Sequence, residues 1–371
     1  MTDSHDAFLL VSFGGPEGPD DVMPFLHNVT RGRGVPPERL EEVAHHYRAF
    51  GGISPINAQN RGLATAIRSE LDARGIALPI YWGNRNWDPY LVDAFRQIRA
   101  DGHRRILAFM TSAYSSYSSC RQYREDLAGA LAATGLAGEL VIDRVRQFFD
   151  HPGFVTPFVE GLSAALRRLT ADGFTIGLTR VLFSTHSIPT AMAETSGPPG
   201  RFGPGGAYVA QHQAAMACVV DAVRAMGVEV PEPSLVYQSR SGSPNVPWLG
   251  PDINDAIRRA HADGIHAVVI VPIGFVSDHL EVIWDLDREA RATCEDLDVR
   301  MIRVATPGTH PAFVAAIGDL VEERLSGRPA TALSDLGPWP ALCATGCCRN
   351  VQADLPTVCS LDSSVGQPVG P

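Results

Sequence analysis

The chain has 371 residues, of which 45% are hydrophobic, and a formal net charge of -10 at pH 7. All 31 of its Lys plus Arg cations are arginines, so a Schiff-base lysine, a phosphate-loop lysine and an ammonium general base are excluded. The acidic balance argues against nucleic acid as a partner. The apolar runs are too short to span a bilayer, and the N-terminus does not look like a signal peptide, so we expect a cytoplasmic protein. At this length we expect two globular domains.

Short apolar runs alternate with longer amphipathic stretches, a pattern that predicts β/α units and parallel sheets. We expect strands at residues 7–12, 79–82, 105–109, 180–184, 234–238, 267–273 and 300–305. We expect helices at residues 62–74, 89–100, 122–131, 157–171, 207–226, 250–262 and 311–325. Because the order of elements occurs twice, the sequence predicts two similar doubly wound α/β domains, at residues 1–160 and 161–328, and a tail at residues 329–371.

Four loops follow predicted strands and carry polar or glycine-rich sequences: SFGGPEGP, TSAYSSYSS, STHSIP and PIGFVSDHLE. In doubly wound sheets, ligands bind beyond the carboxyl ends of the strands. We therefore expect these loops to converge on one cleft between the domains. A Gly/Pro-rich stretch at residues 196–207 is expected to be a mobile surface loop, because a predicted helix follows it directly.

Three carboxylates, Glu281, Asp285 and Glu289, recur every four residues after the strand predicted at 267–273. On an α-helix they would form one ridge, with Asp278 near the helix start. Like charges this close raise at least one pKa unless a cation or solvent compensates. The alternative is a solvated helix face, with the apolar side chains of the segment buried behind it.

His186 lies in the loop STHSIP, after an apolar strand and before a proline. A single histidine is as easily an ordinary core or surface residue. However, the repeat places His186 and Glu281 at equivalent strand ends of one domain. An imidazole and a row of carboxylates facing one cleft suit the removal of protons from a substrate, or the conduction of protons or a divalent metal ion.

The strand ends of the first half carry arginines, hydroxyls and aromatic rings rather than acids. They occur in TRGRG, GGISPIN, GNRNWDP and the hydroxyl-rich run at residues 111–123. Guanidinium groups beside aromatic rings suit an anionic, flat and apolar ligand. Any one of these arginines can equally be an ordinary surface residue.

The chain has seven cysteines, and they are unevenly spread. Three are scattered (Cys120, Cys218 and Cys294), and four lie in the tail (Cys343, Cys347, Cys348 and Cys359). An odd number in a chain without an export signal argues against a disulfide framework, so we expect the tail cysteines to bind a metal. Cys218 and Cys294 lie in helical stretches and are expected to be buried structural thiols.

Five motifs, LLVSFGGP, YRAFGGISP, STHSIP, PWLGP and GFVSDHLEVIWDLD, are found along the chain. Together they resemble the ferrochelatase family over residues 8–325, and the joint occurrence of the second-half motifs is highly specific. The resemblance implies an enzyme that inserts ferrous iron into a porphyrin in heme biosynthesis. It also implies two Rossmann-like domains of the chelatase type, with the active-site cleft between them and no bound nucleotide. The lack of a GxGxxG motif or a phosphate loop agrees with this.

The resemblance implies roles for residues of the second half. His186 is similar to the active-site histidine and Glu281 to its acidic partner, so both would contact the incoming iron. Asp285 and Glu289 resemble the acidic ladder that conducts metal or protons. The implied mechanism bends the macrocycle so that its pyrrole nitrogens turn toward the metal, while the His/Glu pair accepts the two displaced protons.

In the first half, the resemblance implies substrate contacts from Phe13, Arg31, Arg33, Ser54, Arg85 and Tyr123. Phe13 stands where bacterial relatives often have tyrosine, and His46 where some have arginine. Bacterial relatives of this kind mostly act on coproporphyrin III to give coproheme, whereas the other branch uses protoporphyrin IX. A cobalt or nickel chelatase of similar fold and a non-enzymatic tetrapyrrole carrier are the alternatives.

Some ferrochelatases hold a [2Fe-2S] cluster with cysteines of such a tail. The resemblance implies that Cys343, Cys347 and Cys348 bind one here, with Cys120 as the fourth ligand and Cys359 in reserve. Zinc would accept the same four thiolates, and a redox switch that acts on partners is another interpretation of the tail. We expect a monomer that makes transient contacts with other heme-pathway enzymes.

Overall fold

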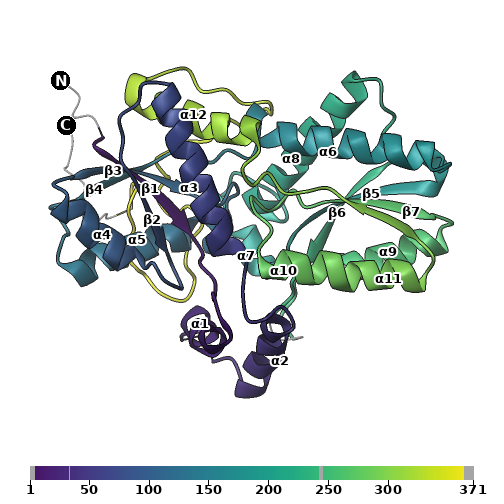
Figure 1. Cartoon of the computed structure of the whole chain (residues 1–371), viewed down its shortest axis with the longest axis horizontal. Helices are drawn as coiled ribbons and strands as arrows, with labels where there is room; N and C mark the ends of the chain where they lie inside the picture. Colours follow the sequence, from purple (N-terminus) through teal and green to yellow (C-terminus); the bar gives the residue numbers. More distant parts are fainter. Residues whose placement is uncertain (1–4, 33, 242–244, 363–371) are drawn as a thin grey trace.

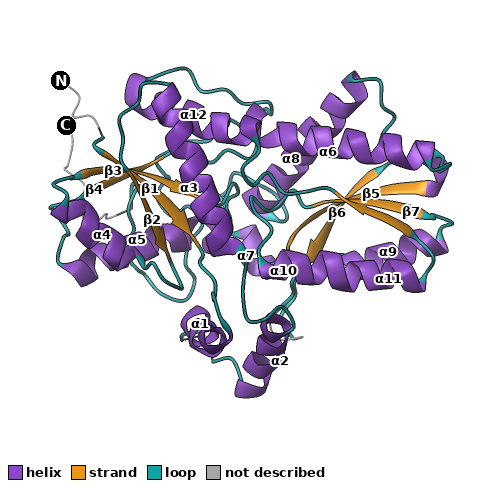
Figure 2. Cartoon of the chain, viewed as in Figure 1, coloured by secondary structure: helices purple, strands orange, loops and turns teal. Residues whose placement is uncertain are grey.

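The structure, a computed structural model, describes residues 5–32, 34–241 and 245–362. Two four-stranded parallel sheets lie side by side (Figure 1), with the strand orders β2-β1-β3-β4 and β6-β5-β7-β8. Helices cover both faces of each sheet (Figure 2). The predicted class, α/β with two similar parallel sheets, is therefore confirmed.

The first sheet is built around a central strand that is buried along its whole length. It consists of β1 (Ala7–Ser12), β2 (Ile80–Asn84), β3 (Arg105–Met110) and β4 (Val141–Arg144). β1 pairs on both sides and is covered by helices on both faces, so all six of its residues avoid water. The helices of this sheet are α3 (Ile56–Ala73), α4 (Leu91–Ala100) and α5 (Gln122–Thr134).

The second sheet repeats the arrangement with β5 as its counterpart of β1. It consists of β5 (Thr179–His186), β6 (Pro233–Gln238), β7 (Ala267–Val271) and β8 (Arg300–Arg303). Its helices are α6 (Pro152–Ala171), α7 (Thr190–Glu194), α8 (Gly206–Ala225), α9 (Ile253–Ala262) and α11 (Arg291–Asp296). β5 ends at His186, so this side chain stands at the carboxyl edge of the sheet.

Three further helices lie outside the simple repeat. α1 (Val22–Val29) and α2 (Pro37–Arg48) form a pair beneath the two sheets in Figure 1 and share a small apolar cluster. α12 (Pro311–Ser326) follows the second sheet in the chain, yet it packs against α3 and α6 and lies beside the first sheet. The predicted domain limits at residues 160 and 328 stay a prediction.

The sequence pattern predicts every strand except β4 and does not predict α1 or α2. β4 has only four residues, two of which are Asp143 and Arg144, so it lacks an apolar run. α3 begins at Ile56, six residues before the predicted start at residue 62. The predicted helices near residues 122, 207 and 311 correspond to α5, α8 and α12.

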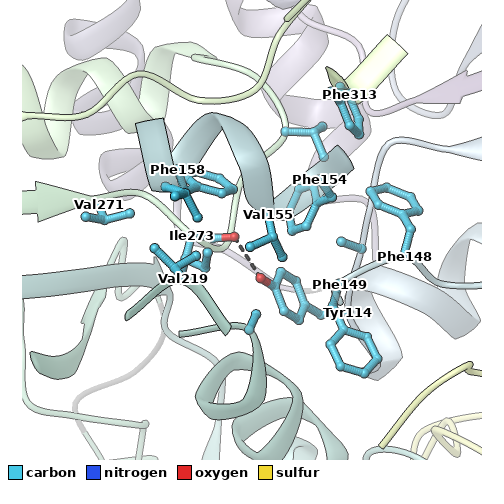
Figure 3. Close-up of a cluster of buried hydrophobic side chains, with 14 of the residues drawn as sticks. Tyr114, Phe148, Phe149, Phe154, Val155, Phe158, Val219, Val271, Ile273 and Phe313 are labelled. Carbon is cyan, nitrogen blue, oxygen red and sulfur yellow. Dashed lines mark hydrogen bonds between the residues drawn. The ribbon is translucent and has the colours of Figure 1, made fainter. Parts of the chain in front are cut away.

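One hydrophobic core continues from one sheet to the other (Figure 3). The ring of Phe154 in α6 lies 5.4 Å from that of Phe148 and 5.9 Å from that of Phe313 in α12. Each buried ring of this size contributes about 1.5–3 kcal/mol through the hydrophobic effect. At the edge of this core, the Tyr114 hydroxyl donates to the backbone carbonyl of Ile273 at 2.8 Å. The loop after β3 is thus tied to the loop after β7.

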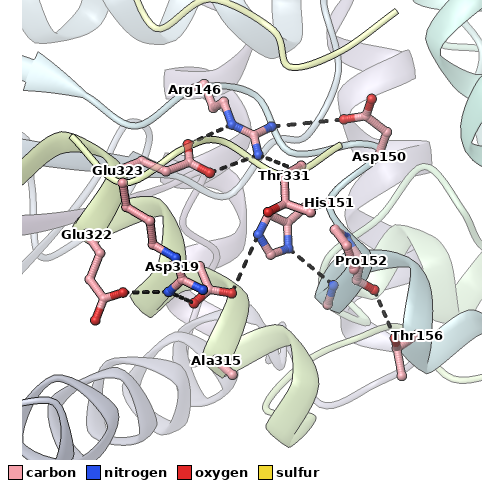
Figure 4. Close-up of polar contacts among 12 residues, drawn as sticks. Arg146, Asp150, His151, Pro152, Thr156, Ala315, Asp319, Glu322, Glu323 and Thr331 are labelled. Atoms are coloured by element: carbon pink, nitrogen blue, oxygen red, sulfur yellow. Dashed lines mark hydrogen bonds and ion pairs between the residues drawn. The ribbon is translucent and has the colours of Figure 1, made fainter. Parts of the chain in front are cut away.

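The tail beyond α12 returns to the first sheet and contains no helix or strand as far as residue 362. Arg146 anchors it by donating to the carbonyl of Thr331 at 2.6 Å while it pairs with Glu323 of α12 at 2.7 Å (Figure 4). The Ser334 hydroxyl donates to Asp150 at 2.6 Å, and the Trp339 ring is buried. These contacts bring the tail cysteines to the edge of the first sheet.

Candidate functional site

His186 and Glu281 meet at the carboxyl edge of the second sheet. His186 is the last residue of β5, and Glu281 lies in α10 (Leu280–Val282), which follows the loop after β7. The His186 Nε2 lies 3.4 Å from the Glu281 Oε1, and the two side chains are 34% and 42% exposed. The other ring nitrogen, Nδ1, contacts the carbonyl of Ser187, so Nδ1 carries a proton and Nε2 faces the carboxylate.

The two groups shift each other's pKa in opposite directions. Burial alone would lower the pKa of His186, but the Glu281 carboxylate outweighs it and raises that pKa to about 9. Burial alone would raise the pKa of Glu281, but the His186 imidazolium lowers it to about 2. At neutral pH the pair is therefore an imidazolium beside a carboxylate.

Asp285 is the next carboxylate along and has a different environment. Burial, followed by the charge of Glu281, raises the pKa of Asp285 to about 7. Its carboxylate accepts hydrogen bonds from Gln238 Nε2 at 3.2 Å and from the hydroxyl of Ser239. Gln238 pairs with His186 across β5 and β6, so the three side chains share one sheet edge. A carboxyl group that titrates near neutrality is suited to pass protons in either direction.

Glu289 lies at the outer end of this row, among aromatic side chains. Its carboxylate accepts from the Trp284 indole at 2.7 Å. The Trp284 ring stacks on His46 of α2, with centroids 3.9 Å apart and planes 11° apart. Arg288 lies over the Phe50 ring at 4.7 Å. The end of the acidic row therefore contacts α2, an element of the first half.

The segment that carries the acids is mostly a π-helix, which corrects the predicted α-helical ridge. α10 is a single turn, and Ile283–Ala290 is π-helical before α11 begins. The i→i+5 hydrogen bonds widen each helical turn. Side chains four residues apart are therefore arranged around the helix axis differently from those on an α-helix. Arg303 holds the segment in place, because it pairs with Asp287 at 2.8 Å and with Asp278 at 3.0 Å.

Side chains from two helices of the first half reach this edge, whereas the convergence of the four predicted loops on one cleft stays a prediction. The side chain of Gln59 in α3 donates to the carbonyl of Asp278 at 3.0 Å. The pKa of Tyr47 in α2 is raised by burial and, secondarily, by the charge of Glu281. A hollow of about 590 Å³ lies at the opposite end of β5, beside Thr179 and Ile176, so it does not include His186.

Three of the predicted substrate residues, Phe13, Arg85 and Tyr123, are packed together in the first half. The Arg85 guanidinium lies 4.3 Å from the Tyr123 ring centroid and 5.7 Å from that of Phe13. Arg85 also forms an ion pair with Asp126, and its side chain is only 3% exposed. In this arrangement the guanidinium orients the two rings, and it reaches a substrate carboxylate only if the Asp126 pair opens.

Ser54 and Arg31, two further predicted substrate residues, have other partners. Ser54 is buried, and its backbone N–H donates to the carbonyl of Pro16 at 2.9 Å. Arg31 is exposed after α1 and donates to the Asn28 side chain at 2.6 Å. Arg33 lies outside the described residues. Substrate contact by these residues stays a prediction.

Four cysteines form a buried cluster beside the first sheet: Cys120, Cys343, Cys347 and Cys348. Cys120 belongs to a π-helical turn, Tyr117–Arg121, that precedes α5, and the other three come from the tail. Cys359 is not part of the cluster, because its thiol donates to the carbonyl of Ile142 at 3.1 Å and packs in the core beneath α5. All seven cysteines are free thiols in the structure.

Two buried arginines face the cysteine cluster. The Arg144 guanidinium lies 3.0 Å from the Cys343 Sγ and 3.6 Å from the Cys120 Sγ. The Arg124 side chain is fully buried, and its Nε and Nη1 have no hydrogen-bond partner among the described residues. Burying cations without counter-charges is costly, so this site favours an anionic occupant. Within the described ranges, no three or more His, Cys, Asp or Glu side chains are arranged to hold a metal ion.

The family model for ferrochelatase matches residues 5–325, almost the whole of the two-sheet body. The chain belongs to the ferrochelatase family. The coproporphyrin III ferrochelatase of Leifsonia xyli is 56% identical over 362 residues, covering 94% of this chain and 92% of that protein. The coproporphyrin III ferrochelatase of Streptomyces coelicolor is 54% identical, with 97% of each chain covered.

Among solved structures, SirB from Bacillus subtilis with Fe3+ aligns with this ferrochelatase-family chain at a TM-score of 0.49 and 12% identity. The alignment covers 87% of this chain and 96% of SirB. In the part of the chain that the structure describes, no helix is both long and apolar enough to cross a membrane.

Sequence reasoning missed several side chains that complete this ferrochelatase-family site. Gln238 and Ser239 donate hydrogen bonds to Asp285. Gln238 is the last residue of a predicted strand and Ser239 is the next residue, so a position at a strand end could have identified them. Arg303, Arg124 and Arg144 gave no such signal, because each becomes notable only through partners distant in sequence.

Proposed function

We propose that this chain is a coproporphyrin III ferrochelatase, which inserts ferrous iron into coproporphyrin III and releases two protons. The observation that carries the proposal is the His186–Glu281 contact of 3.4 Å at the end of β5, followed in line by Asp285. The names of the relatives that are more than half identical support coproporphyrin III as the substrate. Metal insertion of this kind is a lyase reaction of heme biosynthesis.

The site has an acceptor for each proton that leaves the macrocycle. Glu281 is ionised at neutral pH, and it can take one proton once His186 has lost its own, because the His186 imidazolium is what lowers the pKa of Glu281 to about 2. His186 holds a proton in the resting pair, so it must release that proton before it accepts one from the substrate. Asp285, with a pKa of about 7, takes up and passes on such a proton. The divalent ferrous ion then replaces the two pyrrole protons, so the net charge of the macrocycle stays the same.

The first half would hold the flat face and the carboxylates of the substrate. The partly exposed ring of Phe13 offers apolar surface for a macrocycle, and the buried ring of Tyr123 packs against the Arg85 guanidinium behind it. Arg31 is an exposed guanidinium that can pair with a substrate carboxylate. Binding energy from these contacts supports the distortion of the macrocycle that insertion requires.

An anaerobic insertion assay tests the proposal. Purified protein is supplied with ferrous or cobaltous ion and with coproporphyrin III, protoporphyrin IX or sirohydrochlorin. We expect the highest kcat/KM for ferrous iron and coproporphyrin III. A preference for protoporphyrin IX would place the chain in the protoporphyrin IX branch of the family. A preference for cobalt and sirohydrochlorin would make it a different chelatase. Tight porphyrin binding without metal insertion would make it a carrier.

We further propose that Cys120, Cys343, Cys347 and Cys348 bind a [2Fe-2S] cluster. Four thiols gather in one buried group, and the guanidinium groups of Arg124 and Arg144 supply the positive charge that an anionic cluster held by four thiolates needs. Such a cluster would add a one-electron centre to this edge of the sheet. Iron, sulfide and zinc analysis of anaerobically purified protein, with its visible spectrum, distinguishes this cluster from a zinc site.

We also propose that the protein works in the cytoplasm as a monomer, with transient contacts to heme-pathway enzymes. Seven free thiols fit a reducing compartment. Sedimentation velocity at micromolar concentration would reveal a stable dimer and so contradict the monomer.

A further inference from the structure

A buried group of hydrogen-bonding side chains surrounds the backbone of His186. The Tyr208 hydroxyl donates to the carbonyl oxygen of His186 at 2.7 Å. It also lies 3.0 Å from the Thr185 hydroxyl, which lies 2.8 Å from the Nε2 of His212. The Tyr208, Thr185 and His212 side chains are all buried, whereas the His186 ring is partly open to solvent.

The protons in this group can be assigned from the acceptors alone. The Nδ1 of His212 lies 2.7 Å from the carbonyl of Tyr208, and a carbonyl only accepts, so Nδ1 carries the proton. Burial lowers the pKa of His212 to about 3, so the ring is neutral and its Nε2 accepts from the Thr185 hydroxyl. The Tyr208 hydroxyl donates its own proton to the carbonyl of His186, so its 3.0 Å approach to the Thr185 oxygen is a packing contact and not a hydrogen bond.

At its carboxyl end, β5 still pairs with β6 but no longer pairs with β7. β5 pairs with β6 as far as His186, but its pairing with β7 stops at Phe183 and Val271. Beyond Phe183, the Gly274 backbone N–H donates to the Ser184 carbonyl at 3.1 Å, and α8 adds further support through Tyr208 and His212, which lie four residues apart on one helix face. The space is tightly filled, because a Cβ added at Gly274 would lie 2.1 Å from the Thr185 hydroxyl.

The same face of α8 is held by the first half. The His212 ring stacks on Tyr114, with centroids 3.6 Å apart. The backbone N–H of Ser115 donates to the Gln211 side chain at 2.7 Å, and Gln211 donates back to the Ser115 hydroxyl at 3.0 Å. The end of β5 is therefore fixed against the loop after β3, and the position of His186 depends on both halves.

We propose that Tyr208, with Thr185 and His212 behind it, is a positioning residue that fixes the His186 backbone and so aims its imidazole at Glu281 and the substrate. None of the three side chains touches the reacting atoms. The proposal rests on the proposed function, because it assigns the purpose of the positioning to iron insertion. A displacement of the imidazole by about 1 Å is enough to slow the reaction strongly.

The test compares Tyr208→Phe, Thr185→Val and Thr185→Ser with the wild-type protein. Tyr237→Phe is the matched control, because Tyr237 is also buried beside β5, and its hydroxyl makes no hydrogen bond within the described part of the chain. Iron insertion gives kcat and KM, porphyrin fluorescence gives the Kd without metal, and NMR of histidine-labelled protein reports the His186 ring. Thermal unfolding shows whether each variant folds.

We expect Tyr208→Phe and Thr185→Val to lower kcat about tenfold, to leave KM and Kd within about twofold, and to shift the His186 ring signals. Thr185→Ser keeps the hydroxyl and should restore the rate, while Tyr237→Phe should match wild type. Wild-type kcat and unshifted His186 signals in Tyr208→Phe would overturn the proposal. If that variant does not fold, equal rates for the two Thr185 variants would overturn it. If wild type inserts no iron, the proposed function fails, and the NMR shifts still decide the positioning.

Discussion

The two sheets have the same strand order and a fully or largely buried central strand, yet their carboxyl ends carry different chemistry. β5 ends in His186, and the loop after β7 leads to a row of acids. β1 is followed by Phe13, and the loop after β3 leads through hydroxyls to Cys120. The repeated framework therefore determines where side chains can act, while the residues at the strand ends determine what each half can do.

The two halves also treat charge differently. In the second half, the acids are partly exposed or bonded to neutral donors, so they can gain and lose protons. In the first half, Arg85, Arg124 and Arg144 are buried and directed at a carboxylate, at sulfur atoms or at aromatic rings. This difference supports our proposal that the second half handles protons and metal, whereas the first half holds the substrate and the cluster.

The largest effect is expected from His186→Ala. Losing a general base costs about 100-fold to 10,000-fold in rate. We expect kcat for iron insertion to fall by at least about 100-fold, while porphyrin binding in the first half is kept. Porphyrin fluorescence measures that binding. A wild-type rate in this variant would show that His186 is not a required proton acceptor.

Replacing one cluster cysteine should remove the cluster and leave the acid-bearing half intact. We expect Cys120→Ser to lack the visible spectrum of the cluster and to unfold at a lower temperature, because two buried arginines lose their counter-charge. Cys359→Ser is the matched control, since that thiol donates to the carbonyl of Ile142 and lies outside the cluster of four cysteines. An unchanged spectrum in Cys120→Ser would remove Cys120 from the ligand set.

The rate of insertion should depend on pH through the second half. Below a pKa of about 9, His186 is mostly protonated, so the fraction of free imidazole rises about tenfold for each pH unit. We expect kcat to increase from neutral pH towards pH 9 and then to level off. A rate that is flat over this range would show that His186 need not lose its proton before accepting one.

Asp285→Asn should change stability in a pH-dependent manner. The folded-state pKa of about 7 lies above the ordinary value, so the folded protein retains a proton that the unfolded chain has released. Stability therefore falls as pH rises from about 4 to 7. Asparagine carries no charge, so its burial does not cost the free energy needed to bury an ionised carboxylate. We expect the variant to be more stable than wild type by on the order of 1 kcal/mol at pH 8 and equally stable at pH 4. Urea unfolding at the two pH values measures the difference, and equal stability at both would contradict the raised pKa.

The smallest effect is expected at the substrate-binding half. Arg31→Ala should raise the KM for coproporphyrin III about threefold without changing kcat, because an exposed guanidinium contributes at most about 1 kcal/mol. Arg258→Ala in α9 removes an exposed arginine from the second half and should leave KM unchanged. If both variants have the same KM as wild type, the carboxylates of the substrate bind elsewhere.

The meeting of His186 and Glu281 could be predicted from sequence, because strand ends of one parallel sheet share an edge. The gathering of Cys120 with the tail cysteines was implied only by the family resemblance. The burial of Arg85 against Tyr123 and its pairing with Asp126 could not be predicted, since a run of loop residues does not reveal which side chains pack together. The π-helix was missed for a similar reason, because a spacing of four suits an α-helix as well.

The sequence by itself determined the α/β class, the duplicated strand order, the absence of lysine chemistry and the row of acids, because these follow from local periodicity and composition. Only the tertiary structure decided which side chains lose contact with water. It placed Arg124 and Arg144 beside four thiols, raised the pKa of Asp285 and put Tyr208 against the backbone of His186. Burial and pairing depend on residues that are far apart in the chain, so folding, rather than local sequence, sets the charge and the position of each group.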